Sequence, residues 1–214
     1  MANIPSIDPA NLGSLTGSFQ QIFNKLLQRT DGVMPATVVS FDRSSAPPRV
    51  QVQPAIKIRT TDGSQISRAQ IASVPVCRIG GGGAFIDFNL SPGDTGLLFA
   101  CDRDISLFLQ NKTASTPNTD RIKSFSDSFF LPIVLNSGII DPENSAFAVF
   151  QNQNGSISIA IQSDKVKIKG NLAVNGDVEI DGGLTVNGAF TMAGDMYVDG
   201  NIEASGSITP NVPP

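Results

Sequence analysis

A glycine at every sixth residue of the last quarter of the chain constrains the fold more than any other feature. The repeat runs without a slip through Gly170, Gly176, Gly182, Gly188, Gly194, Gly200 and Gly206. After each glycine the second and fourth residues are almost always apolar, and the residue between them is mostly polar. Such alternation is typical of a strand with one buried face. A glycine at a fixed short period, mostly preceded by Asn, Asp or Ser, supplies a corner between strands. The repeat therefore predicts a β-helix or solenoid.

Two kinds of β-helix are compatible with this repeat. The apolar positions are Leu172, Val174, Val178, Ile180, Leu184, Val186, Phe190, Met192, Met196, Val198, Ile202, Ala204 and Ile208. One chain coiling on itself would make little more than two turns, too few to bury a core. Three intertwined chains would instead form a prism of about seven layers spaced ~4.7 Å apart, a rod of roughly 33 Å. We favour the intertwined trimer, and if its corners need positive φ, Gly188→Val should prevent trimer formation.

The composition favours an all-β protein and limits its partners. Charged residues make up 16 % of the chain and hydrophobic ones 40 %, with 20 Gly, 14 Pro and no Trp. The net charge of −4 argues against a nucleic-acid partner. From Gly170 onward there are six carboxylates (Asp177, Glu179, Asp181, Asp195, Asp199 and Glu203) and no Lys or Arg. An acidic rod is not attracted to an anionic membrane surface.

The chain carries few groups suited to catalysis or metal binding. It has no histidine, which removes the commonest metal ligand and the usual general base. Cys77 and Cys101 are expected to be buried free thiols, although a disulfide between them is possible. The run Gly80–Gly83 lacks the lysine and following helix of a phosphate loop, so we interpret it as a flexible loop. Asp102 and Asp104 are interpreted as a solvated turn. We therefore predict no enzyme activity and no catalytic, cofactor-binding or metal-binding residues.

Four segments are expected along the chain. Residues 1–32 contain an amphipathic helix with apolar Leu15, Phe19, Ile22, Phe23, Leu26 and Leu27, a capping box of Ser18 and Gln21, and a stop at Asp31–Gly32. Its apolar stripe packs either on its own domain or against another partner. Residues 33–138 alternate in about five strands, which suggests a small closed barrel of the OB type. Residues 139–169 are a connector (141–154) followed by the first rod strands, whose phase changes at Gln162–Lys165. Residues 170–214 form the hexad-repeat β-helix and its tip.

This order of segments resembles the central spike proteins of contractile phage tails. The residues PATVVSFDRSSAPPRVQVQPAI are similar to the opening hairpin of that family, and SPGDTGLLFACDRDIS to its P-G-D strand and turn. The residues RIKSFSDSFFLPIVL are similar to its closing segment, carried here by Arg121, Ser126, Asp127, Phe129 and Pro132. Together with the repeat, these motifs cover most of the chain.

The resemblance implies a structural virion protein rather than an enzyme. Its members are homotrimeric spikes at the centre of the baseplate, beneath the tail tube, and they pierce the host outer envelope when the sheath contracts. The expected partners are two further copies of the chain, hub or tube proteins at the N-terminal end, and transiently the host outer membrane. Leu15, Phe19, Ile22 and Leu26 would contact the hub or tube. The protein would be made in the host cytoplasm, because no signal peptide or membrane span is visible.

The tip departs from the family pattern. Some members bind a buried iron at the apex through a His-x-His motif, whereas this sequence ends in TPNVPP and carries no histidine. We therefore expect no apex iron and no other cofactor. The tip is closed either by apolar residues such as Ile208 and Val212 or by a separate small cap protein. No segment is long enough to hold the lysozyme domain of some relatives.

Other functional classes make different predictions. A baseplate hub or fibre-attachment protein would share the trimeric rod but never touch a membrane. A hexapeptide-type acyltransferase generally needs a histidine base, which this chain lacks. A trimeric adhesin would be expected to present aromatic residues to a sugar, whereas the rod offers a single Tyr and no Trp.

Overall fold

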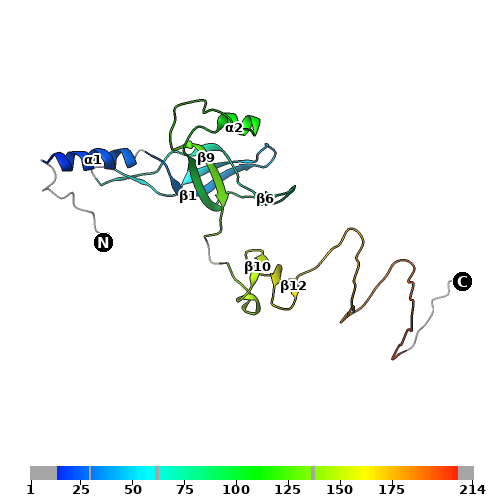
Figure 1. Cartoon of the computed structure of the whole chain (residues 1–214). Helices are drawn as coiled ribbons and strands as arrows, with labels where there is room; N and C mark the ends of the chain where they lie inside the picture. The colour runs from blue at the N-terminus through cyan, green and yellow to red at the C-terminus, as the bar shows by residue number, and fades with distance from the viewer. Residues whose placement is uncertain (1–13, 29, 61–62, 136–137, 207–214) are drawn as a thin grey trace.

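The computed structural model describes residues 14–28, 30–60, 63–135 and 138–206 (Figure 1). The barrel region carries strands β1 (Val33–Asp42), β2 (Arg49–Pro54), β3 (Ile58–Arg59), β4 (Gln65–Ile66), β5 (Ile71–Pro75), β6 (Ile79–Gly81), β7 (Ala84–Ile86), β8 (Thr95–Cys101) and β9 (Ser124–Pro132). Helix α1 (Leu15–Gln28) precedes them, and helix α2 (Ser106–Asn111) lies between β8 and β9. The 3-10 turn η2 (Pro142–Asn144) and strands β10 (Ala148–Gln151), β11 (Ser158–Ile161) and β12 (Val166–Lys169) follow.

Five of these strands form a nearly closed barrel. They pair in the order β5-β2-β1-β8-β9, each with an antiparallel neighbour. A parallel bridge between Val76 and Phe130 joins the two outer strands. Alternate residues of β2 are buried, as the sequence alternation predicts. The all-β prediction is confirmed for this region, and the strand order agrees with a small barrel.

The barrel encloses the main hydrophobic core of the described residues. Its fully buried side chains include Val50, Val52, Leu98 and Phe130, which come from three different strands. Each fully buried aliphatic or aromatic side chain contributes about 1.5–3 kcal/mol to folding. The barrel therefore has a core of its own, independent of the C-terminal repeat.

Two hairpins extend from the barrel sheet. β3 pairs with β4, and β6 pairs with β7. The glycine run that we expected to be a flexible loop belongs to the second hairpin, with Gly82 and Gly83 at positive φ (61° and 89°) in its turn. A side chain at Gly80 would meet the backbone of Phe85 at 2.5 Å, so the two strands approach too closely for a larger residue. The run is thus structural and contains no phosphate loop.

The predicted N-terminal helix is present, but its cap differs from the prediction. Helix α1 begins one turn before the expected capping box, and the hydroxyl of Ser14 accepts a hydrogen bond from the N–H of Gly17 (3.0 Å). Ser18 and Gln21 therefore lie inside the helix. The short helix α2 was not predicted, because we interpreted its surroundings as a polar turn and loop.

A second, smaller sheet follows the barrel. It has the order β10-β11-β12, with both pairs antiparallel. The pair β11–β12 confirms the two alternating strands with a phase change between them. Strand β10 lies within the segment that was predicted to be a connector. In Figure 1 helix α1 extends from the barrel on the side away from this sheet.

Residues 170–206 form no helix or strand within the single chain. Figure 1 shows them as an extended trace that changes direction repeatedly. The predicted rod is not established by one chain, because its ladder would join different chains. No helix within the described ranges is long and apolar enough to cross a membrane.

Candidate assembly interface

One face of the small sheet is entirely apolar and open. The register places Phe150 opposite Ile159, Ile159 opposite Ile168, and Ile161 opposite Val166. These five side chains, together with exposed Ala148, project from the same face because residues two apart in a strand share a face. The five large side chains are 45–63 % exposed. A contiguous apolar patch of this kind marks an interaction surface.

The opposite face of the same sheet is covered by the segment 139–144. Lys169 Nζ donates to Asp141 Oδ2 (2.9 Å), and Lys167 pairs with Glu143. Gln162 Nε2 donates to Asn144 Oδ1 (3.0 Å), and the Asn144 side chain is fully buried. The hydrogen bond from Lys169 is the main reason that the pKa of Asp141 lies below its usual range. One face is thus covered within the chain, whereas the apolar face is open.

The apolar face continues without a change of phase into the hexad repeat. Val166 and Ile168 stand at even-numbered positions, as do Ala204 and the Leu, Ile, Val, Phe and Met residues of the repeat from Leu172 to Ile202, and every third even position is a glycine. The large apolar side chains between Leu172 and Ile202 are 38–69 % exposed. β12 is therefore in phase with the repeat, and a single apolar row extends from Val166 to Ala204.

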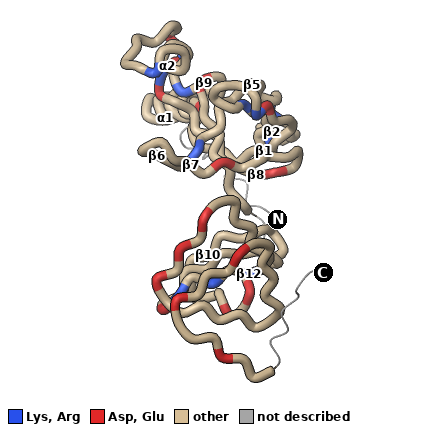
Figure 2. Tube along the Cα trace, turned by 90° about the vertical axis from the view of Figure 1, so that its right-hand side faces the viewer, with Lys and Arg blue, Asp and Glu red and all other residues tan. Residues whose placement is uncertain are grey.

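The polar positions of the repeat carry all of its charge. The six carboxylates (Asp177, Glu179, Asp181, Asp195, Asp199 and Glu203) occupy odd-numbered positions, opposite in phase to the apolar row. Figure 2 shows acidic residues along this part of the trace, with basic residues only nearer β12. In an extended strand the two sets project to opposite sides. The repeat can therefore bury one side and keep the acidic side in water.

The predicted glycine corners are found at some positions of the repeat and not at others. Positive φ occurs at Gly170 (109°), Gly176 (150°), Gly194 (141°) and Gly200 (152°). Gly182 and Gly188 do not have a left-handed backbone. The expectation that Gly188 needs positive φ is therefore not supported in the single chain. Gly170 has the clearest requirement for glycine, because its φ is 109° and a Cβ added there would also lie 3.4 Å from Ile157 Cγ1.

Two residues of the predicted closing segment, Arg121 and Asp127, build a partly buried ion-pair network rather than a binding site. Arg121 Nε donates to Asp127 Oδ2 (2.8 Å), and its Nη2 donates to Asp127 Oδ1 (3.1 Å) and Asp104 Oδ2 (3.1 Å). Ser126, Phe129 and Pro132 lie in β9, which completes the barrel.

Asp104 is buried, contrary to the expectation from the sequence. We interpreted it as part of a solvated turn, whereas its side chain is 1 % exposed. It accepts hydrogen bonds from the backbone N–H of Ser106 and the hydroxyl of Thr119 (both 2.8 Å). Ser106 contributes most to a pKa of about 2, followed by Thr119 and then Arg121. No local motif around Asp104 indicates that partners 15 and 17 residues away would bury it.

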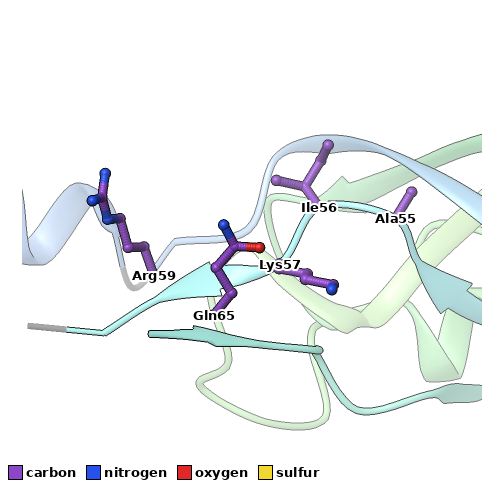
Figure 3. Close-up of a pocket in the computed structure, with 5 residues that line it drawn as sticks. All are labelled: Ala55, Ile56, Lys57, Arg59 and Gln65. Carbon is purple, nitrogen blue, oxygen red and sulfur yellow. The ribbon is translucent and has the colours of Figure 1, made fainter. Parts of the chain in front are cut away.

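Other candidate groups do not converge on a reaction centre. Cys77 and Cys101 are free and partly buried, and burial raises the pKa of both thiols. In the part of the chain that the structure describes, no three His, Cys, Asp or Glu side chains are placed to hold a metal ion. A pocket beside the β3–β4 hairpin is lined by Ala55, Ile56, Lys57, Arg59 and Gln65. Figure 3 shows that these side chains point in different directions rather than toward one centre.

Comparisons with known proteins find a match in the barrel. Residues 34–133 match the family model described as the phage protein Gp138 N-terminal domain. A search of curated proteins found no match. The matched range extends from β1 to the end of β9 and does not include the small sheet or the repeat. The match indicates a structural protein of a phage virion.

Proposed function

We propose that the chain is the homotrimeric central spike of a contractile-tail baseplate and that it pierces the host outer envelope when the sheath contracts. The observation that carries this proposal is the apolar row from Val166 to Ala204, which one chain leaves exposed. The phage structural domain in the barrel supplies the context.

A trimer satisfies the row in a way that one chain cannot. The backbone N–H and C=O groups of residues 170–206 have no strand partner within the chain. Unpaired strand edges tend to pair with other chains, and an intertwined prism provides that pairing at every layer. The apolar rows of three chains would meet on the axis, while the acidic positions would face water.

The same arrangement explains how the rod would bear load. In an intertwined prism each strand pairs with strands of the other two chains, so local separation would break many backbone hydrogen bonds together. Axial force from a contracting sheath would therefore pass along the rod without unwinding it. The barrel end would face the tail tube, and the repeat would point toward the host.

The tip belongs to the proposal but lies outside the described residues. Ile208 and Val212, expected to close the apex, fall within residues 207–214. The absence of histidine from the whole sequence still argues against a His-x-His iron site there. A separate cap protein remains the other proposed means of closing the rod.

The position of the protein in the particle tests this function. Cryo-electron microscopy of the parent phage should show a three-fold density on the tail axis, with the barrel against the tube and the rod pointing outward. Density away from the axis, at the fibre attachment points, would instead support the alternative function of a hub or fibre-attachment protein that does not contact the membrane.

A further inference from the structure

Helix α1 presents a second apolar surface that the described residues of its own chain do not cover. Leu15, Phe19, Ile22, Phe23, Leu26 and Leu27 are each 55–76 % exposed. The sequence left open whether this stripe packs on its own domain. Among the described residues it does not pack there, so the stripe is open to a partner.

The spacing within the stripe is that of a coiled coil. Leu15, Phe19, Ile22 and Leu26 follow one another at intervals of four, three and four residues. This places Leu15 and Ile22 at d positions and Phe19 and Leu26 at a positions of a heptad. Leu at a with Ile at d, as in Leu26 and Ile22, favours three or four strands over two. The exposed Phe23 and Leu27 widen the stripe beyond the narrow seam of a dimer.

The charge of the helix favours its own copies over other surfaces. Between Leu15 and Gln28 the only charged residue is Lys25. Membrane-surface helices usually carry several Lys or Arg on their polar face, which α1 lacks. A nearly uncharged helix is not steered toward a charged protein surface. Identical copies of it also have little like-charge repulsion to overcome.

The barrel anchors the base of the helix. The N–H of Asp31 donates to the carbonyl of Lys123 (2.8 Å), and its carboxylate accepts from the N–H of Phe125 (3.0 Å). Arg68 also donates to this carboxylate (3.3 Å). The C-terminal end of α1 is therefore only a few residues from a point fixed on the barrel.

We propose that the α1 helices of three copies associate in parallel as a short three-helix coiled coil through Leu15, Phe19, Ile22 and Leu26. This inference rests on the trimer of the proposed function. An isolated helix of 14 residues is marginal in water. Within a trimer, however, the helices share one end of the molecule at an effective concentration on the order of millimolar. The bundle would then stand at the barrel end that is opposite the rod.

Site-specific crosslinking of the full-length chain tests this proposal. Cys77→Ser and Cys101→Ser first remove the native thiols, and Ile22→Cys or Asn24→Cys is then added. Ile22 is at a core d position, whereas exposed Asn24 is at the outward f position two residues later. A short thiol-specific crosslinker should link chains at least five-fold more efficiently through Ile22→Cys than through Asn24→Cys. Leu26→Cys, at the next core position, repeats the test if Ile22→Cys fails to assemble.

The native mass of each variant separates the possible results. Trimeric variants that crosslink equally weakly would overturn the bundle and leave the trimer intact, and the stripe would then belong to a hub or tube protein. A monomeric parent chain would instead overturn the trimer of the proposed function, and the bundle with it. Strong crosslinking at Ile22→Cys and Leu26→Cys, but not at Asn24→Cys, supports the bundle.

Discussion

Gly96 lies in β8, directly beside the buried ring of Phe130. A Cβ at this position would stand 2.3 Å from Phe130 Cζ and 2.6 Å from the carbonyl oxygen of Leu131. Because Phe130 is fully buried in the core, its ring cannot move away without disturbing Leu98 and their neighbours. We predict that Gly96→Ala lowers the free energy of unfolding by about 1–3 kcal/mol, as overpacking does. Urea unfolding followed by circular dichroism measures this.

Gly32→Ala is the matched control. A Cβ at Gly32 would meet no atom within 4 Å, and its backbone is not left-handed. The control should unfold within about 0.5 kcal/mol of the parent protein. If the two variants had equal stability, the close approach at Gly96 would not be a constraint on the barrel.

The buried carboxylate of Asp104 predicts a pH dependence of stability. Its pKa is about 2 in the folded chain and 3.8 when unperturbed. A lowered folded-state pKa means that the stabilisation is complete above pH 3.8 and is lost as the pH falls through about 2. Asp104→Asn should therefore lower the melting temperature at neutral pH and flatten its decline between pH 4 and about 2.

Thermal unfolding from pH 2 to pH 7 distinguishes the effect of Asp104 from that of other carboxylates. The exposed Asp120→Asn serves as the control and should retain the decline of the parent protein. If Asp104→Asn declined as steeply as the parent, the ion-pair network with Arg121 would not be the source of the acid sensitivity.

At the scale of elements, neighbouring residues of the repeat should respond oppositely to a charge. Met196 belongs to the apolar row and Tyr197 to the polar side, and both are exposed in one chain (65 % and 92 %). In a trimer Met196→Asp would bury an unpaired charge and should reduce the trimer fraction at least ten-fold. Tyr197→Asp should leave it unchanged. Equal effects in analytical ultracentrifugation would contradict the assignment of the buried face.

The glycine corners give a second test at this scale. Gly170 has a φ of 109°, where a side chain costs on the order of 1–3 kcal/mol, whereas Gly188 lacks that conformation. Gly170→Ala should therefore lower the melting temperature of the assembled protein, and Gly188→Ala should change it little. The reverse order would mean that assembly changes the backbone at these corners.

The elements that the sequence predicts are those with a regular period. Alternation reveals β1, β2, β11 and β12, and the spacing of Leu15, Phe19 and Ile22 reveals α1. Strand β10 escapes prediction because residues 146–150 are a continuous apolar run without the alternation of β11 and β12, and they follow a turn-rich segment. The helix is capped by Ser14 rather than by Ser18. Both serines carry a hydroxyl that can cap a helix, and the residue at which the helix begins decides which of them does so. Asp104 is missed because its partners are distant in the sequence.

At the scale of the whole molecule, the two halves of the chain differ in how they are stabilised. The barrel buries its own core, as Val52 and Phe130 illustrate, and closes through the bridge from Val76 to Phe130. The repeat buries nothing between residues 170 and 206 of one chain, yet its Leu, Ile, Val, Phe and Met residues there all stand at even positions and its carboxylates all stand at odd positions. A sequence can thus predict which side of a repeat is buried, while the number of copies that bury it depends on contacts between chains.

The native mass of the full-length chain tests the central claim most directly. Native mass spectrometry, paired with electrophoresis in unheated SDS, should give three times the 22.5 kDa chain mass and a band that enters the monomer position only after heating. This result would mean that the apolar row from Val166 to Ala204 is buried between three chains. A monomer of 22.5 kDa in solution would contradict the trimeric spike and its role in piercing the envelope.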